Sequence, residues 1–332
     1  MATYNGDKYL REQLDSIYAQ TYKQFEVVVT DDCSTDDTIT ILREYEQKYR
    51  LKYFTNVHAL GFVKNFERAI SLCEGDYIAL SDQDDVWLPR KIEILYNEMI
   101  TCEITNPDKP IIVHHDVYIV DENLKNNGVR FINWRGNVFG LNNLLFGNPK
   151  VQGASSMFNR KLKEICFPLP VSVPLHDLYI SYVCECFGIR KYISEPLMLY
   201  RQHANNQIGV ISYSIYERVT KFFNKEIVLA DENEKKTLLI FENQFSNKLS
   251  NVNKDVIRDY FEILGNEISV GCKVAKIFRN RFNSDGSILK LILKILNSVS
   301  NESPSGKQRG IKIPAAQDKS RSKLRVTNPN RD

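Results

Sequence analysis

Hydrophobic residues in the first hundred positions alternate between the spacing of a helix and that of a strand. Leu10, Leu14 and Ile17 recur on one helical face, which predicts an amphipathic helix up to about residue 18. Residues 25–30 are rich in β-branched side chains, and such a run predicts a buried strand. The same patterns predict helices at 38–49 and 63–73, strands at 52–55 and 76–81, and a helix that begins after Pro89.

Strands and helices that alternate in this way predict an α/β fold with a mostly parallel central sheet flanked by helices. Beyond residue 111 the pattern changes to longer loops and isolated strands, at 111–115, 117–120, 155–158 and 197–201. We therefore predict one α/β domain in two halves, followed by two further regions. The halves are residues 1–112 and 113–215, the helical extension is 216–300, and a basic tail at 301–332 is expected to be disordered.

The composition is that of an ordinary globular protein, with 43% hydrophobic and 26% charged residues among 332. Disordered, collagen-like and disulfide-scaffold classes are therefore excluded for the chain as a whole. In the tail, Lys and Arg outnumber Asp and Glu by more than the net charge of +3, so the rest of the chain is slightly acidic. This charge distribution predicts that the protein does not bind nucleic acid.

Seven cysteines are scattered without a C-x-x-C pair, which favours neither a disulfide framework nor a zinc ribbon. The start of the chain lacks the pattern of a signal peptide, and no run of 18 apolar residues is present. We therefore expect a cytoplasmic protein, with the inner face of the cell membrane as a further location.

Acidic residues follow two of the predicted strands. Asp31 and Asp32 end the first, and Asp82, Asp84 and Asp85 follow the second. The carboxyl ends of parallel strands meet at one edge of a sheet, so one cleft can collect both clusters. A solvated turn would also explain the second cluster, but crowded carboxylates need a compensating cation, and oxygen ligands select Mg²⁺ or Mn²⁺.

Eight short segments, in order, resemble the family 2 glycosyltransferases of the GT-A fold, in particular bacterial polysaccharide rhamnosyltransferase-like members. They are residues 2–6, Gln20-Thr21, 29–38, 61–65, 81–89, 153–156, His176-Asp177 and Tyr200-Arg-Gln-His203. The resemblance implies an inverting enzyme that moves a sugar from a nucleotide diphosphate donor to a glycan or lipid-linked saccharide in surface polysaccharide synthesis. It favours dTDP-L-rhamnose as the donor, with UDP-sugars next.

The resemblance also implies roles for individual residues. Residues 1–112 would bind the nucleotide sugar, and 113–215 would bind the acceptor. The nucleotide would be bound by Thr3, Tyr4, Asp32, Lys64, Asn65 and Asp82. The metal would be bound by Asp84, with His203 completing the site, and Asp177 would be the catalytic base. On the acceptor side would lie Gly153, Ser155 and His176.

Purely structural roles would also fit several of these residues. Asp32 could cap a turn, and Asp177 could be the first-turn residue of a helix. Lys64 and Asn65 could simply begin a surface helix, and a lone histidine such as His203 is often structural. His114 and His115 lie inside an apolar strand with no ligand at a suitable spacing, so we interpret both as structural.

Two other functions fit parts of the pattern. Asp82-x-Asp84-x-Val86 fits the nucleophile loop of aspartyl-phosphate phosphatases, in which Asp82 would be phosphorylated, but that loop belongs on the first strand of its domain. An inactive sugar-nucleotide-binding module is the second, because Met1 stands where family members have a β-branched strand and the first strand is expected to be truncated.

The end of the helical extension also predicts a contact with membranes. Residues 287–299 place Lys290 and Lys294 on one stripe of an otherwise apolar helix, and four basic residues precede it: Lys273, Lys276, Arg279 and Arg281. Such a helix suits the surface of an anionic bilayer. A helix packed on the catalytic domain would show the same apolar pattern.

Overall fold

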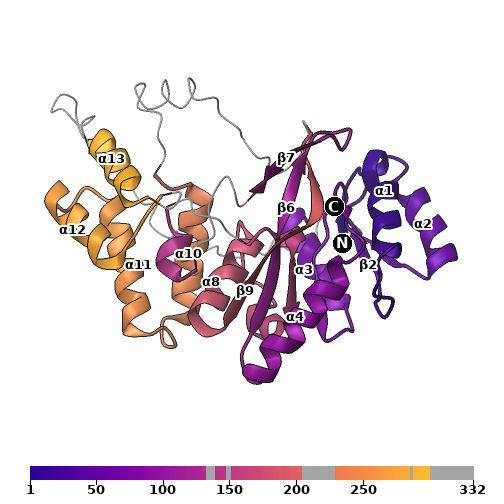
Figure 1. The fold of residues 1–332 in the computed structure, drawn as a ribbon, viewed down its shortest axis with the longest axis horizontal. Coiled ribbons are helices and arrows are strands. Elements are labelled where there is room, and N and C mark those ends of the chain that lie inside the picture. The colour runs from indigo at the N-terminus through magenta and orange to yellow at the C-terminus, as the bar shows by residue number, and fades with distance from the viewer. Residues whose placement is uncertain (132–138, 147–150, 204–228, 285–286, 300–332) are drawn as a thin grey trace, which may run out of the picture.

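The computed structural model describes residues 1–131, 139–146, 151–203, 229–284 and 287–299 (Figure 1). The strands are β1 (Ala2–Thr3), β2 (Val28–Asp31), β3 (Lys52–Thr55), β4 (Tyr77–Ala79), β5 (Val86–Trp87), β6 (Ile111–Val120), β7 (Asn126–Arg130), β8 (Ser156–Asn159) and β9 (Ile189–Arg201). The helices of the first half are α1 (Asp7–Tyr18), α2 (Thr38–Tyr49), α3 (Phe62–Leu72) and α4 (Lys91–Thr105). The later helices are α6 (Leu141–Leu144), α7 (Arg160–Cys166), α8 (His176–Phe187), α10 (Glu232–Phe245), α11 (Asn251–Leu264), α12 (Val270–Asn280) and α13 (Ile288–Val299). The tail predicted to be disordered, 301–332, lies outside the described residues.

A small parallel sheet forms the start of the domain. Its order is β1-β2-β3, with Ala2 opposite Thr30 and Val28 opposite Lys52. All four residues of β2 are buried, because helices α1 and α3 cover this strand and its neighbours. The predicted bounds of α2 and β3 are confirmed residue for residue.

A second, mixed sheet has the order β4-β8-β6-β9-β5, and β7 pairs with β6. Strands β6 and β9 are parallel, whereas β8 is antiparallel to both β4 and β6. The two strands predicted at 111–115 and 117–120 are one strand, β6. Its register with β9 shifts at Asp116, and this irregularity explains why the hydrophobic pattern of the sequence breaks there.

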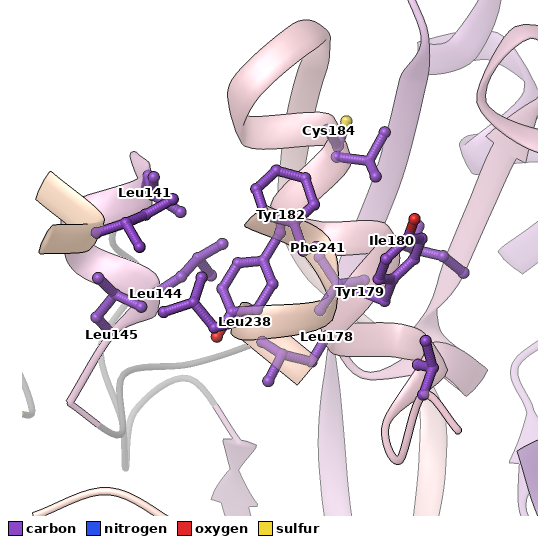
Figure 2. Close-up of a cluster of buried hydrophobic side chains, with 14 of the residues drawn as sticks. Leu141, Leu144, Leu145, Leu178, Tyr179, Ile180, Tyr182, Cys184, Leu238 and Phe241 are labelled. Atoms are coloured by element: carbon purple, nitrogen blue, oxygen red, sulfur yellow. The ribbon is translucent and has the colours of Figure 1, made fainter. Parts of the chain in front are cut away.

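The C-terminal helices share a hydrophobic core with the second sheet. Helix α8 contacts α7, β9 and α10. In Figure 2, leucines of α6 lie close to Leu238 and Phe241 of α10 and to Tyr182 of α8, all of them buried. Residues 229–284 and 287–299, the described parts of the helical region expected at 216–300, thus form an extension packed on the α/β domain, at the opposite end of Figure 1 from α1 and α2; the rest of that region lies outside the described residues. Within the described residues, no helix is both long enough and apolar enough to cross a membrane.

The strand directions gather several chain segments at one edge. Because β8 is antiparallel to β4 and to β6, and β6 is parallel to β9, the strands β4, β6 and β9 all run the same way. Their carboxyl ends therefore lie at the same edge of the sheet. Asp82 follows β4 at this edge and His203 follows β9, so residues more than a hundred positions apart come together.

Candidate active site

Asp84 and His203, both assigned to a metal from the sequence, are in direct contact. The Nε2 atom of His203 lies 2.9 Å from Oδ2 of Asp84, and the two side chains are 11% and 15% exposed. The ring of Tyr9, on α1, lies against the imidazole with 4.8 Å between the ring centroids. The loop after β4, the end of β9 and helix α1 thus build this site together.

The carboxylates of the loop 82–85 crowd one another. Burial, and then the charges of Asp84 and Asp177, raise the pKa of Asp82 to about 7. Burial, with the charges of Asp82 and Asp84, also raises the pKa of Asp85 well above its usual value. One oxygen of Asp85, Oδ2, is buried without a hydrogen-bond partner. A cation in this loop would relieve the repulsion among these groups.

The residues present fit a divalent metal that takes part of its coordination from the substrate. The described residues contain no group of three or more His, Cys, Asp or Glu side chains arranged around a metal position. Asp84 and His203 would supply two ligands. Mg²⁺ usually binds through one or two carboxylates and keeps its remaining positions for water and substrate phosphates. The pair therefore suits Mg²⁺ or Mn²⁺ bound together with a diphosphate.

Arg201 supports the loop 82–85. The sequence indicated the motif Tyr200-Arg-Gln-His203 but no role for this arginine. Its buried guanidinium donates from Nε to the main-chain oxygen of Asp84 (2.7 Å) and from Nη1 to that of Glu122 (2.6 Å). It also forms an ion pair with Glu12 on α1. The main-chain nitrogen of Arg201 donates to Oδ1 of Asp85 over 3.2 Å. One arginine therefore connects the loop, α1 and the end of β6.

Thr3 and Asn65, expected to bind the nucleotide, are buried in the sheet. Thr3 Oγ1 donates to Oδ1 of Asp31 (2.9 Å). The amide of Asn65 donates to the main-chain oxygens of Thr3 (3.3 Å) and Thr30 (3.0 Å). These polar atoms are used within the protein. The geometry therefore supports a role for both residues in joining β1, β2 and α3 rather than in touching a ligand.

Asp32 is 6% exposed and holds the segment before α3. Its carboxylate accepts hydrogen bonds from the main-chain nitrogens of Leu60 (2.7 Å) and Gly61 (2.8 Å) and from the amide of Asn56 (2.7 Å). Gly61 adopts φ +82°, a conformation that other residues rarely take. Asp32 thus fixes the main chain of the loop between β3 and α3.

The remaining residues of the donor side are more accessible. The side chain of Tyr4 is 53% exposed. Lys64 is 43% exposed at its side chain and pairs with Glu67, one turn further along α3. Tyr4 directly follows β1, so a ligand at this edge can reach its ring, whereas the ammonium of Lys64 points towards Glu67 and the main-chain oxygen of Leu169.

Asp177 lies in the first turn of α8, close enough to the loop 82–85 for its charge to act on Asp82. Its charge contributes to the raised pKa of Asp82, which places the two carboxylates in one electrostatic environment. A Cβ atom built on Gly153 would lie 3.8 Å from Cβ of Asp177, so this glycine leaves the space beside the carboxylate open. The N-terminus of a helix stabilises a negative charge. Gly153 and Asp177, both expected on the acceptor side, are therefore neighbours.

His176 and Ser155 have their side chains in the protein interior. The ring of His176 stacks on Phe66 with 4.9 Å between centroids and contacts Phe62 at 5.1 Å. Burial lowers the pKa of His176. Ser155 Oγ donates to the main-chain oxygen of Gln152 (2.8 Å). Both residues fix the elements that carry Gly153 and Asp177.

Lys91, in the first half of the domain, is hydrogen-bonded to Ala154 in the second half. It is completely buried, and its Nζ donates to the main-chain oxygen of Ala154 (2.6 Å), between Gly153 and Ser155. The ammonium also lies 3.8 Å from the ring centroid of Trp87. Sequence reasoning missed Lys91 because a lysine near the start of a helix is usually exposed. Its burial is the feature that sets it apart, and no local sequence pattern reveals that burial.

Comparisons with known proteins agree with this architecture. The model of the family "Glycosyl transferase family 2" matches residues 1–165. The dTDP-rhamnosyl transferase RfbG of Shigella flexneri is 29% identical over 245 residues, which cover 68% of this chain and 82% of that protein. An uncharacterized glycosyltransferase of Haemophilus influenzae is 28% identical over 240 residues, which cover 68% of this chain and 72% of that protein.

The solved structures agree with the fold expected from the sequence. Residues 1–349 of S. aureus TarS, in complex with UDP, superpose with a TM-score of 0.56 at 16% identity over 90% of this chain and 87% of that one. This similarity confirms the GT-A fold, with its α/β sheet flanked by helices and its helical C-terminal region. Residues 1–165 of the chain belong to glycosyl transferase family 2.

Proposed function

We propose that this glycosyltransferase inverts the anomeric centre of the sugar it transfers, and that it depends on Mg²⁺ or Mn²⁺ bound by Asp84 and His203. One observation carries the proposal: Asp84 and Asp177, from different halves of the domain, both raise the pKa of the same residue, Asp82. The residue proposed to bind the metal and the residue proposed as the base therefore act on the same aspartate, one from the donor half and one from the acceptor half.

On the donor side, the protein would hold the nucleotide along the carboxyl ends of β1 and β4. The exposed ring of Tyr4, Lys64 and Asp82 are the groups that would contact it. Thr3, Asp32 and Asn65 would keep the hydrogen bonds that join β1, β2 and the segment before α3, and would not contact the nucleotide. A bound divalent cation would supply positive charge for the departing diphosphate. The carboxylate of Asp84 would set the position of that charge.

On the acceptor side, Asp177 would accept the proton of the attacking hydroxyl. Asp177 is the acidic residue in the first turn of α8. Gly153 leaves room beside it for a sugar, while His176 and Ser155 hold the surrounding elements. The acceptor would be a glycan or a lipid-linked saccharide of a surface polysaccharide.

The relatives favour one donor over the others. RfbG of Shigella flexneri is described as a dTDP-rhamnosyl transferase, which favours dTDP-L-rhamnose for this chain. TarS was solved with UDP, so UDP-sugars come next. A phosphatase acting through Asp82 is disfavoured, because β1 and β2 precede the strand that carries this aspartate.

A screen of donors tests the proposal. The protein would be incubated with dTDP-L-rhamnose, UDP-glucose and UDP-N-acetylglucosamine, with Mn²⁺ or with EDTA, and the released nucleotide diphosphate measured. We expect release from one donor, dependent on metal and absent in Asp84→Asn. Nucleotide binding without any turnover would identify the chain as an inactive binding module. Release that is unaffected by EDTA would contradict the role of the metal.

We further propose that the enzyme works at the cytoplasmic surface of the membrane, where a lipid-linked acceptor would lie. Helix α13 packs inward through Leu291 and Ile295, and its other face leaves Leu289, Leu293 and Leu296 exposed by 65%, 45% and 44%. Those three leucines would enter the interface. Replacing them together by glutamine should abolish flotation with phosphatidylglycerol vesicles, and unchanged flotation would contradict the proposal.

Three of the basic residues expected to face the membrane have internal partners. The ammonium of Lys273 donates to the main-chain oxygen of Gly265 (2.6 Å). Lys276 and Arg279 both pair with the buried carboxylate of Asp259. These residues join α11 to α12, so any contact of this region with lipid would depend mainly on the leucines.

A further inference from the structure

Gln83, the middle residue of the metal loop, binds the main chain of Tyr4 through both ends of its side-chain amide. The nitrogen of Tyr4 donates to Oε1 of Gln83 over 2.8 Å, and Nε2 of Gln83 donates to the oxygen of Tyr4 over 3.0 Å. This reciprocal pair fixes the orientation of the amide. It joins two segments that are 79 residues apart in the sequence.

Gly6 provides the space for this contact. A Cβ atom at Gly6 would lie 2.5 Å from Oε1 and 2.6 Å from Cδ of Gln83, well inside van der Waals contact. The backbone of Gly6 has φ −107°, which any residue can adopt. An alanine here would therefore displace the amide of Gln83 without straining the main chain. Gly6→Ala and Gln83→Ala are two independent ways to break the same pair.

The segment that contains Tyr4 is held from its other side by α2 and the loop before it. Asn5 N donates to Ser34 Oγ (2.9 Å), and Gly6 N donates to Thr38 Oγ1 (2.8 Å). Asn5 has φ +46°, so the chain turns sharply after Tyr4. Gln83 is the contact that ties this turn to the loop carrying Asp82 and Asp84.

We propose that Gln83 is a positioning residue for the donor, which holds the main chain of Tyr4 where the nucleoside contacts it, in fixed relation to the metal at Asp84. The proposal rests on the proposed function, because it requires that a nucleotide diphosphate binds between these segments. Gln83 itself touches neither the reacting sugar nor the proton transfer. Its loss should therefore weaken donor binding and leave the chemical step unchanged.

Donor binding and turnover measured on the full chain test this role. UDP and dTDP would each be titrated in the presence of saturating Mn²⁺. For Gln83→Ala we expect the Kd of each nucleotide, and the KM of the donor, to rise about tenfold. A tenfold rise corresponds to a loss of about 1.4 kcal/mol of binding free energy. The kcat should stay within about twofold, and the Kd for Mn²⁺ alone should not change. Gln47→Ala, on the exposed face of α2, is the control and should behave like the wild type.

A double-mutant cycle separates a specific contact from general damage. Gly6→Ala should raise the Kd about as much as Gln83→Ala does, and the double variant should bind no worse than either. Additive losses, a fall in kcat instead of a rise in KM, or wild-type affinity in both single variants would overturn the role of Gln83 while leaving the proposed function intact. If the wild-type protein bound neither nucleotide with Mn²⁺, the proposed function and this inference would both be wrong.

Discussion

Arg201 has no proposed chemical role, but it determines the position of Asp84, one of the two residues proposed to bind the metal. Its guanidinium donates to the main-chain oxygen of Asp84, and its own main-chain nitrogen donates to Asp85. His203 follows two residues later. The position of Asp84 relative to His203 therefore depends on the planar, multidentate guanidinium, which a lysine ammonium cannot reproduce.

We predict that Arg201→Lys lowers the affinity for Mn²⁺ on the order of 10- to 100-fold, as is typical when a group that orients metal ligands is lost. Titration of Mn²⁺ followed by electron paramagnetic resonance measures this directly. Arg160→Lys is the matched control, because Arg160 is more than half exposed and pairs with the exposed Asp76. Equal Mn²⁺ affinities in the two variants would exclude the positioning role.

At single positions, the sequence correctly brought two distant residues together but did not reveal which residues are buried. Asp84 and His203 were assigned to one site and lie 2.9 Å apart. Thr3 and Asn65 were assigned to the nucleotide, but their side chains join strands. Both kinds of residue occur in the same short motifs, and only the three-dimensional packing separates those that face a ligand from those that support the sheet.

Among the elements, the helices with a strong amphipathic pattern were predicted well and the strands of the second sheet less so. Helix α2 begins and ends where its pattern predicted. Strand β9 covers Ile189–Arg201, although only 197–201 was predicted, because exposed and buried positions do not alternate regularly along it. Hydrogen bonds with β6 along most of its length stabilise the first part of β9, whose local sequence does not indicate a strand.

Helices α11 and α12 depend on one buried carboxylate. Asp259 is fully buried and accepts hydrogen bonds from Lys276 (2.6 Å) and Asn280 (2.6 Å), with Arg279 as a further partner. Hydrogen bonds and ion pairs with these donors lower its pKa. The carboxylate thus offsets its desolvation through several charged or polar donors.

We predict that Asp259→Asn reduces the free energy of unfolding by about 2 kcal/mol, the typical value for hydrogen bonds to a charged group. Urea denaturation measures the loss, and kcat should remain near that of the wild type because the site is remote. Asp255→Asn is the control on the same helix, since Asp255 is 54% exposed and should cost less than about 0.5 kcal/mol. Equal losses in the two variants would contradict a structural role for the buried carboxylate.

At the scale of the whole molecule, buried neutral histidines make the fold sensitive to acid. Burial, and then the charge of Arg190, lower the pKa of His114 to about 3. Burial also lowers the pKa values of His115 and His176. A histidine in the unfolded chain titrates near 6.5, so below that pH the unfolded state binds protons that the folded state does not. Stability contributed by these residues is therefore lost as the pH falls below about 6.5.

Removing one histidine isolates this effect. Between pH 6.5 and 5, a single buried neutral histidine should reduce the free energy of unfolding by about 1.6 kcal/mol. Urea denaturation at each pH gives the free energy of unfolding of His114→Gln and of the wild type. Between pH 6.5 and 5 this free energy should fall less in His114→Gln, and the difference should be about the amount expected for one histidine. Absolute stabilities of the two proteins need not agree. Parallel curves of stability against pH would show that His114 is not held neutral in the folded protein.

The central claim is that the two halves of the domain divide the work, with metal and donor at Asp84 and proton acceptance at Asp177. The rate of sugar transfer by Asp177→Asn in a single turnover, at saturating donor and Mn²⁺, tests it most directly. We predict that this rate falls on the order of 10² to 10⁴, while the Kd of the nucleotide stays near that of the wild type. Transfer by Asp177→Asn at near wild-type rate would contradict this division of roles.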